Sequence, residues 1–418
     1  MVKHSVPSMG HFFTRERFGR PQVVAGCLLL VFLVQCLWLV SRRASRIPAE
    51  EFERISEGSG QWRGEYIAGT PHSAVAAASQ DESHGLSPKS EGYDVNRSPL
   101  WFLIASSPHA TLARLLHFDP FAIWGWLATF PFLIFGTLSG ASVWYVARRL
   151  YGNFGGYIAL GLYCFSPEVI RSSALWYRDG EIGAAWGAFG AVFTAIAVAH
   201  TLYAPREVVL WNWRRILLLA ISLVLAVGSQ FSLVIIIPGA LAFMLYLSPT
   251  RRLAALTIWA SASVLALLFL YTAYFFHGKV LWESLRHADF LGVSWRAFVM
   301  PRAYAQLIAQ LGQSSPALLI AIPVTVAFYI AWPRTRYFGN TAPLLMAALF
   351  LLLALGTPHF PGLGFNLVAL PFLFVFIAGI AADVLETRQR ALAASCLLGL
   401  LVANALWNLW ELARVGLA

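Results

Sequence analysis

The chain has 418 residues, of which 58% are hydrophobic and 12% are charged, and its formal net charge at pH 7 is +10. Soluble domains carry about 25% charged residues, so this composition excludes an ordinary soluble fold. Apolar stretches of about 20 residues recur, and they lack the alternating polarity of β-barrel strands. We therefore expect an all-α fold, a polytopic bundle of membrane-spanning helices.

The first predicted element is a membrane span at residues 21–40, preceded by a basic tail at residues 1–20. The span is too long for a cleavable signal peptide, and no small-residue cleavage site follows its arginine-rich exit. The sequence therefore predicts a cytoplasmic tail followed by a single integral membrane domain at 21–418.

Apolar segments along the rest of the chain extend this pattern to about eleven predicted spans. In chain order they are 21–40, 121–147, 154–167, 181–203, 214–229, 231–248, 253–276, 315–333, 341–356, 365–385 and 391–410.

Arginines in the short loops predict the orientation of these spans. Every short loop on the side of the N-terminus contains at least two arginines, as at Arg148 and Arg149 or at Arg251 and Arg252, whereas most short loops on the other side contain few. Positive residues near span ends mark the cytoplasmic side. This distribution places the N-terminus inside, and it also explains the net positive charge without a nucleic-acid partner.

Two long segments are predicted on the external side, at 41–120 and 277–314. In the first, residues 72–96 have the composition of a mobile loop, whereas 98–104 and 111–118 are amphipathic and too short to span, which predicts interfacial helices. The second mixes aromatic and basic residues, which suits contact with membrane lipids and their phosphates.

Two acidic clusters fall at the predicted external face. Glu50 and Glu51 follow the first span, and Asp179 lies in a loop between later spans. A carboxylate within hydrogen-bond reach of an acceptor hydroxyl can take its proton, so these three residues are our candidate catalytic groups. The alternatives are a solvated charged turn for the two glutamates, and for Asp179 an ion pair with Arg171 or Arg178, or a helix N-cap.

Three basic residues are candidates for binding a donor phosphate. Arg171 and Arg178 lie on the external side, against the trend of the other arginines, and a guanidinium binds phosphate bidentately. His359 lies in a predicted external loop, although a single loop histidine is more often merely exposed. The sequence requires no cofactor and shows no metal-ligand spacing, so a divalent metal at the acidic residues remains an open alternative.

Five stretches, taken in order, resemble motifs of one family of membrane enzymes. The family motifs are an acidic pair after the first span, an (H/S)-P-L-Y segment, an A-R-R-L-F-G inner turn, an L-S-P span end with a second acidic loop, and a Gly-polar-apolar-L-P-A hairpin. In this chain they stand as Glu50-Glu51-Phe52, Ser98-Pro99-Leu100-Trp101, Ala147-Arg148-Arg149-Leu150-Tyr151-Gly152, Phe165-Ser166-Pro167 running on to Arg178-Asp179, and Val227-Gly228-Ser229-Gln230-Phe231 followed by Ile237-Pro238-Gly239-Ala240.

Together these stretches resemble the GT-C superfamily of integral membrane glycosyltransferases, in particular protein O-mannosyltransferase-like and aminoarabinose-transferase-like proteins. The resemblance implies a GT-C-like fold in the bacterial inner membrane. It also implies transfer of a sugar from a polyprenyl-phosphate donor to a lipid, glycan or protein acceptor at the extracytoplasmic face, within the cell envelope.

The chain departs from the family pattern at two basic positions. Ser229-Gln230 stands where a lysine is common, and Gly364 to Pro371 stands where an R-Y-L-L-P pattern often opens a late span. The alternatives are therefore a family member that binds the donor without turnover, or a non-catalytic transporter or scaffold for envelope polysaccharide assembly. The sugar and the acceptor are not identified by the sequence.

Overall fold

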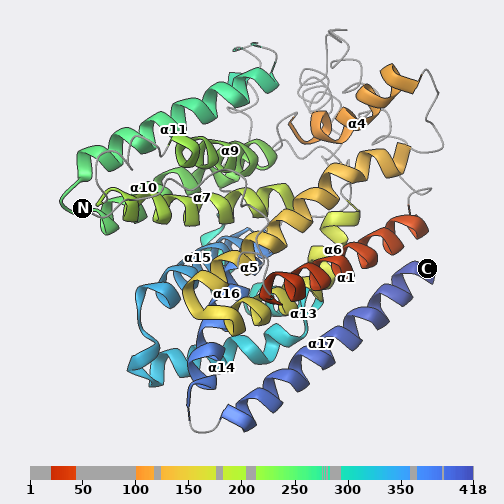
Figure 1. Cartoon of the computed structure of the whole chain (residues 1–418), viewed down its shortest axis with the longest axis vertical. Helices are drawn as coiled ribbons and strands as arrows, with labels where there is room; N and C mark the ends of the chain where they lie inside the picture. Colours follow the sequence, from red (N-terminus) through yellow and green to blue (C-terminus); the bar gives the residue numbers. More distant parts are fainter. Residues whose placement is uncertain are drawn as a thin grey trace, which may run out of the picture.

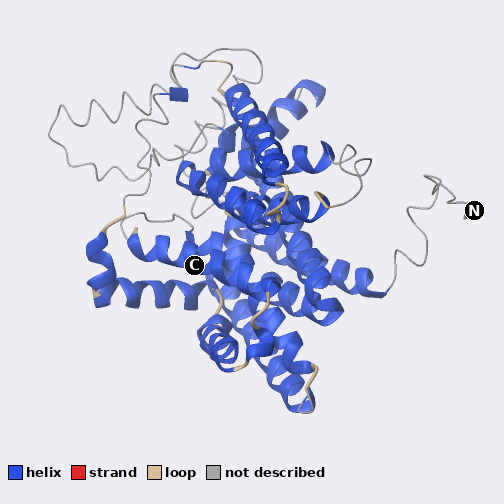
Figure 2. Ribbon diagram, turned by 90° about the vertical axis from the view of Figure 1, so that its left-hand side faces the viewer, coloured by secondary structure: helices blue, strands red, loops and turns tan. Residues whose placement is uncertain are grey.

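The computed structural model describes residues 20–43, 100–116, 124–175, 182–203, 213–274, 276, 278, 281–282, 293–357, 365–387 and 390–417. These residues are almost entirely helical, and no strand occurs among them (Figure 2). The predicted all-α class is confirmed over this part of the chain.

The helices follow one another along the chain with short connections. They are α1 (Arg20–Arg43), α4 (Leu100–Leu116), α5 (Trp124–Cys164), α6 (Pro167–Ala174), α7 (Ile182–Thr201), α9 (Trp213–Ser229), η4 (Phe231–Ile235), α10 (Ile236–Leu247), α11 (Arg252–Ala273), η5 (Trp295–Val299), α13 (Pro301–Ser314), α14 (Ala317–Ala331), η6 (Pro333–Thr335), α15 (Phe338–Gly356), α16 (Phe365–Leu385) and α17 (Arg390–Leu417).

Seven helices of the described chain are long and apolar enough to cross a membrane, and there are eight if α13 and α14 together form one bent span. The prediction of eleven spans is not confirmed. Helix α9 and the η4–α10 segment are shorter than the others, and α5 contains two predicted spans in one helix of 41 residues. Within α5, Gly152 adopts φ 75° and ψ −170°, a left-handed backbone conformation that favours glycine, and this residue kinks the helix.

Helix α16 lies at the centre of the bundle, between α5, α7 and α15 (Figure 1). It is apolar on all sides, and 15 of its 21 residues are buried, as expected for a helix surrounded by other helices. Its Phe372 ring packs against Phe189 and Phe193 of α7 and against Phe350 of α15, with ring centroids 5.3, 6.0 and 5.8 Å apart. These rings join the two groups of helices that lie on either side of α16.

Helices α7 and α9 form the closest pair in the bundle, because α7 is rich in glycine and alanine. A Cβ atom on Gly187 would lie 2.4 Å from the backbone nitrogen of Ala226. Small residues allow membrane helices to approach this closely, and the packing of the two backbones replaces the hydrophobic driving force that is missing in lipid.

Helix α4 corrects the prediction of two separate interfacial helices at 98–104 and 111–118. A single helix runs from Leu100 to Leu116 and continues through Pro108. The proline ring removes the hydrogen bond to the Ile104 carbonyl, and the hydroxyl of Ser107 donates to that oxygen instead, at 2.8 Å. The predicted mobile loop at 72–96 lies outside the described residues.

Helix α13 meets α14 at an angle of 111°. Its Tyr304 and Ile308 are exposed, as are Trp295 and Val299 of the preceding η5. Exposed apolar and aromatic side chains on a helix turned across the direction of its neighbour are consistent with the interfacial segment predicted at 277–314.

Candidate functional site

One of the six predicted site residues, Arg171, lies in the described part of the chain. The other five lie outside the described residues, so their positions stay predictions: Glu50, Glu51, Arg178, Asp179 and His359.

The described elements nevertheless bring together the starting points of the two acidic segments. Helix α1, which precedes the Glu50 segment, packs along α6, which precedes the Asp179 segment. The Cys36 sulfur of α1 lies 4.0 Å from the Ile170 carbonyl oxygen of α6, and Leu39 is fully buried in this contact region. The two acidic segments therefore leave the bundle from neighbouring helices.

Arg171 lies on α6, a helix of eight residues that begins at Pro167, immediately after α5 ends. Its Nε donates to the carbonyl of Pro167 at 3.4 Å, and its Nη2 donates to the carbonyl of Gln313 on α13 at 3.3 Å. A guanidinium has five N–H donors, and within the described residues Arg171 forms no ion pair. This side chain is therefore held between two helices and retains donors for an anion.

The break between α5 and α6 meets the break between α13 and α14. The Ser166 hydroxyl, at the first break, donates to the carbonyl of Ser314, at the second, at 2.7 Å, and both side chains are buried. Non-helical backbone at membrane depth is tolerated where it is buried in protein or lines a cavity, because each of its polar groups needs a partner. We call these two breaks, with the side chains that bridge them, the polar junction.

Asn404 of α17 completes the polar junction. Its Nδ2 donates to the Phe165 carbonyl at 2.9 Å, and its Oδ1 accepts from the Ser315 hydroxyl at 3.0 Å and from the Ala317 backbone N–H at 3.2 Å. One side chain thus supplies partners for groups at both breaks, which ordinary helical hydrogen bonds leave open.

A second amide pair lies on the same helix. Asn408 donates from Nδ2 to Gln35 Oε1 of α1 at 2.5 Å, and Gln35 Nε2 donates to the carbonyl of Cys164 at 3.2 Å. Both side chains are buried, Gln35 being 6% exposed. The junction therefore joins α1, α5, α6, α13, α14 and α17, and sequence reasoning did not assign it. The available signal was the presence of amide side chains within apolar spans, which are costly in lipid unless they are partnered.

The break between α9 and η4 lies beside the start of α7, close to where the Asp179 segment ends. Gln230 is buried there, and its Nε2 donates to the Ser232 hydroxyl at 2.7 Å. The Ser229 hydroxyl oxygen would lie 3.3 Å from a Cβ placed on Gly183 of α7. Gln230 occupies the place where the resemblance led us to expect a lysine, and its amide bonds within its own turn.

The start of α16 contacts α13 through another amide pair. Asn366 Nδ2 donates to Gln310 Oε1. Asn366 follows the segment that contains His359, and it lies where the resemblance led us to expect basic residues. In the described chain, this part of the site is therefore formed by neutral amides, and Arg171 supplies the cationic group.

No group of three His, Cys, Asp or Glu residues that could hold a metal ion occurs among the described residues. Metal dependence is thus not tested here, because the acidic candidates lie in the segments outside that range. No known protein family, curated protein or solved structure matches this sequence.

Proposed function

We propose that this protein is a membrane glycosyltransferase that moves a sugar from a polyprenyl-phosphate donor to a hydroxyl acceptor at the face opposite the arginine-rich loops. The observation that supports the proposal most directly is the polar junction. Four broken or bent helical connections would serve no purpose in a purely structural bundle, whereas an enzyme needs polar groups at membrane depth to act on a lipid-linked substrate.

In the proposed reaction, the acceptor hydroxyl oxygen attacks the anomeric carbon of the donor sugar. Glu50 or Glu51 takes the hydroxyl proton as the new carbon–oxygen bond forms. The bond between the anomeric carbon and the phosphate oxygen breaks, and its electron pair leaves with polyprenyl phosphate. Direct displacement of this kind inverts the configuration at the anomeric carbon.

The phosphate gains negative charge as it leaves, so cationic donors near it would lower the barrier. Arg171 is suited to this role, because contacts to α6 and α13 fix its position and leave N–H groups for an anion. Arg178 and His359 are the further candidates, and Asp179 would orient the acceptor or the base. These roles rest on the resemblance and on the packing of α1 against α6.

The experiment is donor turnover by the purified protein in nanodiscs, measured as release of polyprenyl phosphate from a panel of polyprenyl-phosphate sugars. The variants are Glu51→Gln, Asp179→Asn and Arg171→Gln, each compared with Glu411→Gln, a charge-neutralising control near the same end of α17. We expect turnover by the wild type and by the control, and loss of about a hundredfold or more for the carboxylate variants.

A positioning role for Arg171 predicts a different result from a structural one. Because Arg171 would contact the donor phosphate, Arg171→Gln should weaken turnover while the thermal unfolding temperature stays unchanged. Turnover that survives both carboxylate substitutions would overturn the assignment of the acidic residues. Donor binding without turnover for any sugar would replace the proposal with a non-catalytic, donor-binding protein.

A further inference from the structure

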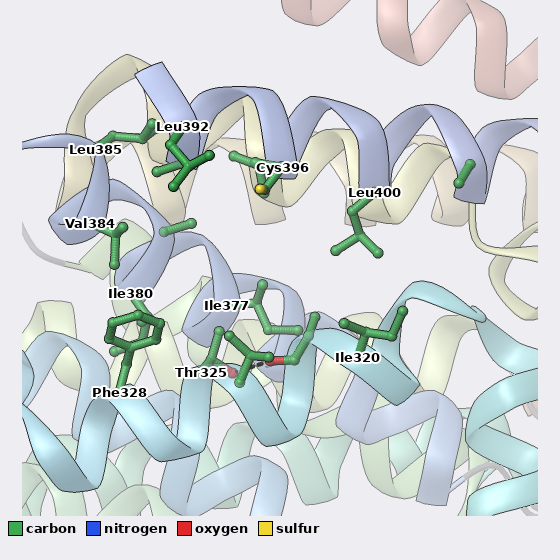
Figure 3. Close-up of a pocket in the computed structure, with 16 residues that line it drawn as sticks. Ile320, Thr325, Phe328, Ile377, Ile380, Val384, Leu385, Leu392, Cys396 and Leu400 are labelled. Carbon is green, nitrogen blue, oxygen red and sulfur yellow. Dashed lines mark hydrogen bonds between the residues drawn. The ribbon is translucent and has the colours of Figure 1, made fainter. Parts of the chain in front are cut away.

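A deep groove lies between α14, α16 and α17, with a volume of about 680 Å³ (Figure 3). Helix α17 covers it from one side, with Leu392, Cys396 and Leu400 directed towards side chains of the other two helices. The volume is within the range of pockets that bury small organic ligands. The groove is separate from the polar junction, and the inference below does not depend on the proposed function.

The walls of the groove are almost wholly apolar. The residues that line it are Ile320, Ala321, Val324, Thr325, Phe328, Ile377, Ile380, Ala381, Val384, Leu385, Leu392, Ala393, Cys396, Leu397, Leu400 and Ala403. The hydroxyl of Thr325 donates to the Ala321 carbonyl at 2.6 Å, so it asks for no partner from a ligand. Such walls favour a hydrocarbon chain over any polar occupant.

The packing of α17 explains why the groove stays open. Near one end, the amides of Asn404 and Asn408 fasten α17 to the rest of the bundle. Beyond them towards Arg390 it faces α14 and α16 across the groove, and many of its apolar residues are exposed, including Leu392 and Leu398. A cavity of this size between membrane helices would be costly if empty, because its lining atoms would lack contact partners.

Charged groups surround the end of the groove that lies away from the polar junction. Arg390 begins α17, two residues before the groove residue Leu392. Arg334, in η6 after α14, forms an exposed ion pair with Glu386, which directly follows the groove residue Leu385. A basic opening to an apolar groove between membrane helices matches the charge of an anionic lipid headgroup.

Two further charged groups lie at this end. Arg336 donates to the carbonyls of Tyr329 and Ile330 at the end of α14, and Asp383 accepts from Asn340 Nδ2 at 3.2 Å. Both are engaged within the protein. Arg390 is therefore the cation best placed for a ligand, with Arg334 beside it in its exposed pair.

We propose that this groove binds one anionic glycerophospholipid, with an acyl chain between α14, α16 and α17 and the phosphate at Arg390. The lipid would fill the space beneath α17 and hold that helix to the bundle. It would belong to the leaflet at the arginine-rich end, which is the opposite leaflet from the polar junction.

Cys396 provides a probe inside the groove, since it is exposed, whereas Cys36 and Cys164 are buried. In a Cys27→Ser background, Cys396 is thus the only accessible thiol of the four cysteines. We would measure its rate of labelling by N-phenylmaleimide in detergent, alone and with added dioleoyl phosphatidylglycerol or dioleoyl phosphatidylcholine. We expect phosphatidylglycerol to protect Cys396 about fivefold more than phosphatidylcholine at equal concentration, because of one arginine contact.

Matched variants separate a specific site from general coating by lipid. Arg390→Gln should abolish the preference for phosphatidylglycerol, whereas Arg252→Gln, a similar change at the start of α11, should preserve it. Ala393→Phe would fill the groove and should reduce the phosphatidylglycerol retained in native mass spectrometry. Ala394→Phe, on the exposed side of the same turn, should retain it. Equal protection by both lipids, or full preference in Arg390→Gln, would overturn the proposal.

Discussion

Replacing Asn404 with alanine tests whether the polar junction holds the bundle together. The substitution removes three hydrogen bonds, to Phe165, Ser315 and Ala317. Side-chain hydrogen bonds in membrane proteins contribute about 0.6 kcal/mol each, which gives about 2 kcal/mol for the three. The carbonyl of Phe165 and the N–H of Ala317 are then left without partners in a dry interior, which raises the expected loss to about 4 kcal/mol.

The assay is equilibrium unfolding in mixed micelles by titration with sodium dodecyl sulfate, followed by tryptophan fluorescence. Asn408→Ala, which removes one bond to Gln35, should cost about 1 kcal/mol, and Leu406→Ala, at a position 63% exposed, should cost little. If Asn404→Ala lowers the free energy of unfolding no more than Asn408→Ala does, then the three contacts of Asn404 do not act as the reasoning requires.

Two further predictions concern close packing and ionisation. Gly187→Ala should destabilise the protein by about 3 kcal/mol, because its Cβ would lie 2.4 Å from the Ala226 nitrogen, whereas Gly399→Ala meets no atom within 4 Å and should be neutral or slightly stabilising; equal unfolding temperatures for the two variants would contradict this packing. Burial raises the pKa of the Tyr337 hydroxyl above its usual 10.0, and the Asp383 carboxylate beside it adds to the effect. The stability gained from neutral Tyr337 is therefore complete below about pH 10 and is lost at higher pH, so the advantage of the wild type over Tyr337→Phe in unfolding free energy should shrink between about pH 9 and about pH 11. A constant difference would show that the hydroxyl does not titrate as inferred.

The sequence predicted the positions of the helices better than their relations in space. Hydropathy alone located α16 at 365–385, because an element that is apolar on all sides needs no partner to be recognised. The same reasoning placed a break between predicted spans near Gly152, but a helical assignment continues through it with a single non-helical residue. At α4, Pro108 suggested an interruption, and a serine hydroxyl removed the need for one.

The polar junction could not be predicted, because its members are far apart in the sequence. Ser166 and Ser314 are separated by 148 residues, and Phe165 and Asn404 by 239. A sequence pattern shows that Asn404 is a polar residue in an apolar span, but only the packing of α17 against two helix breaks shows which groups it joins. The predicted acidic residues lie in segments outside the described residues, so the arrangement of carboxylates at the site remains a prediction.

The pairing of Gln35 with Asn408 across 373 residues has a consequence for biogenesis. The ribosome makes α1 first among the described helices and α17 last, so Gln35 must wait in the bilayer during most of translation without its native partner. Contacts between distant parts of a chain also form late, since a long loop must close first. We therefore expect nascent chains that stop before α17 to remain loosely assembled and open to membrane proteases, with the arrival of the final helix acting as the step that completes maturation.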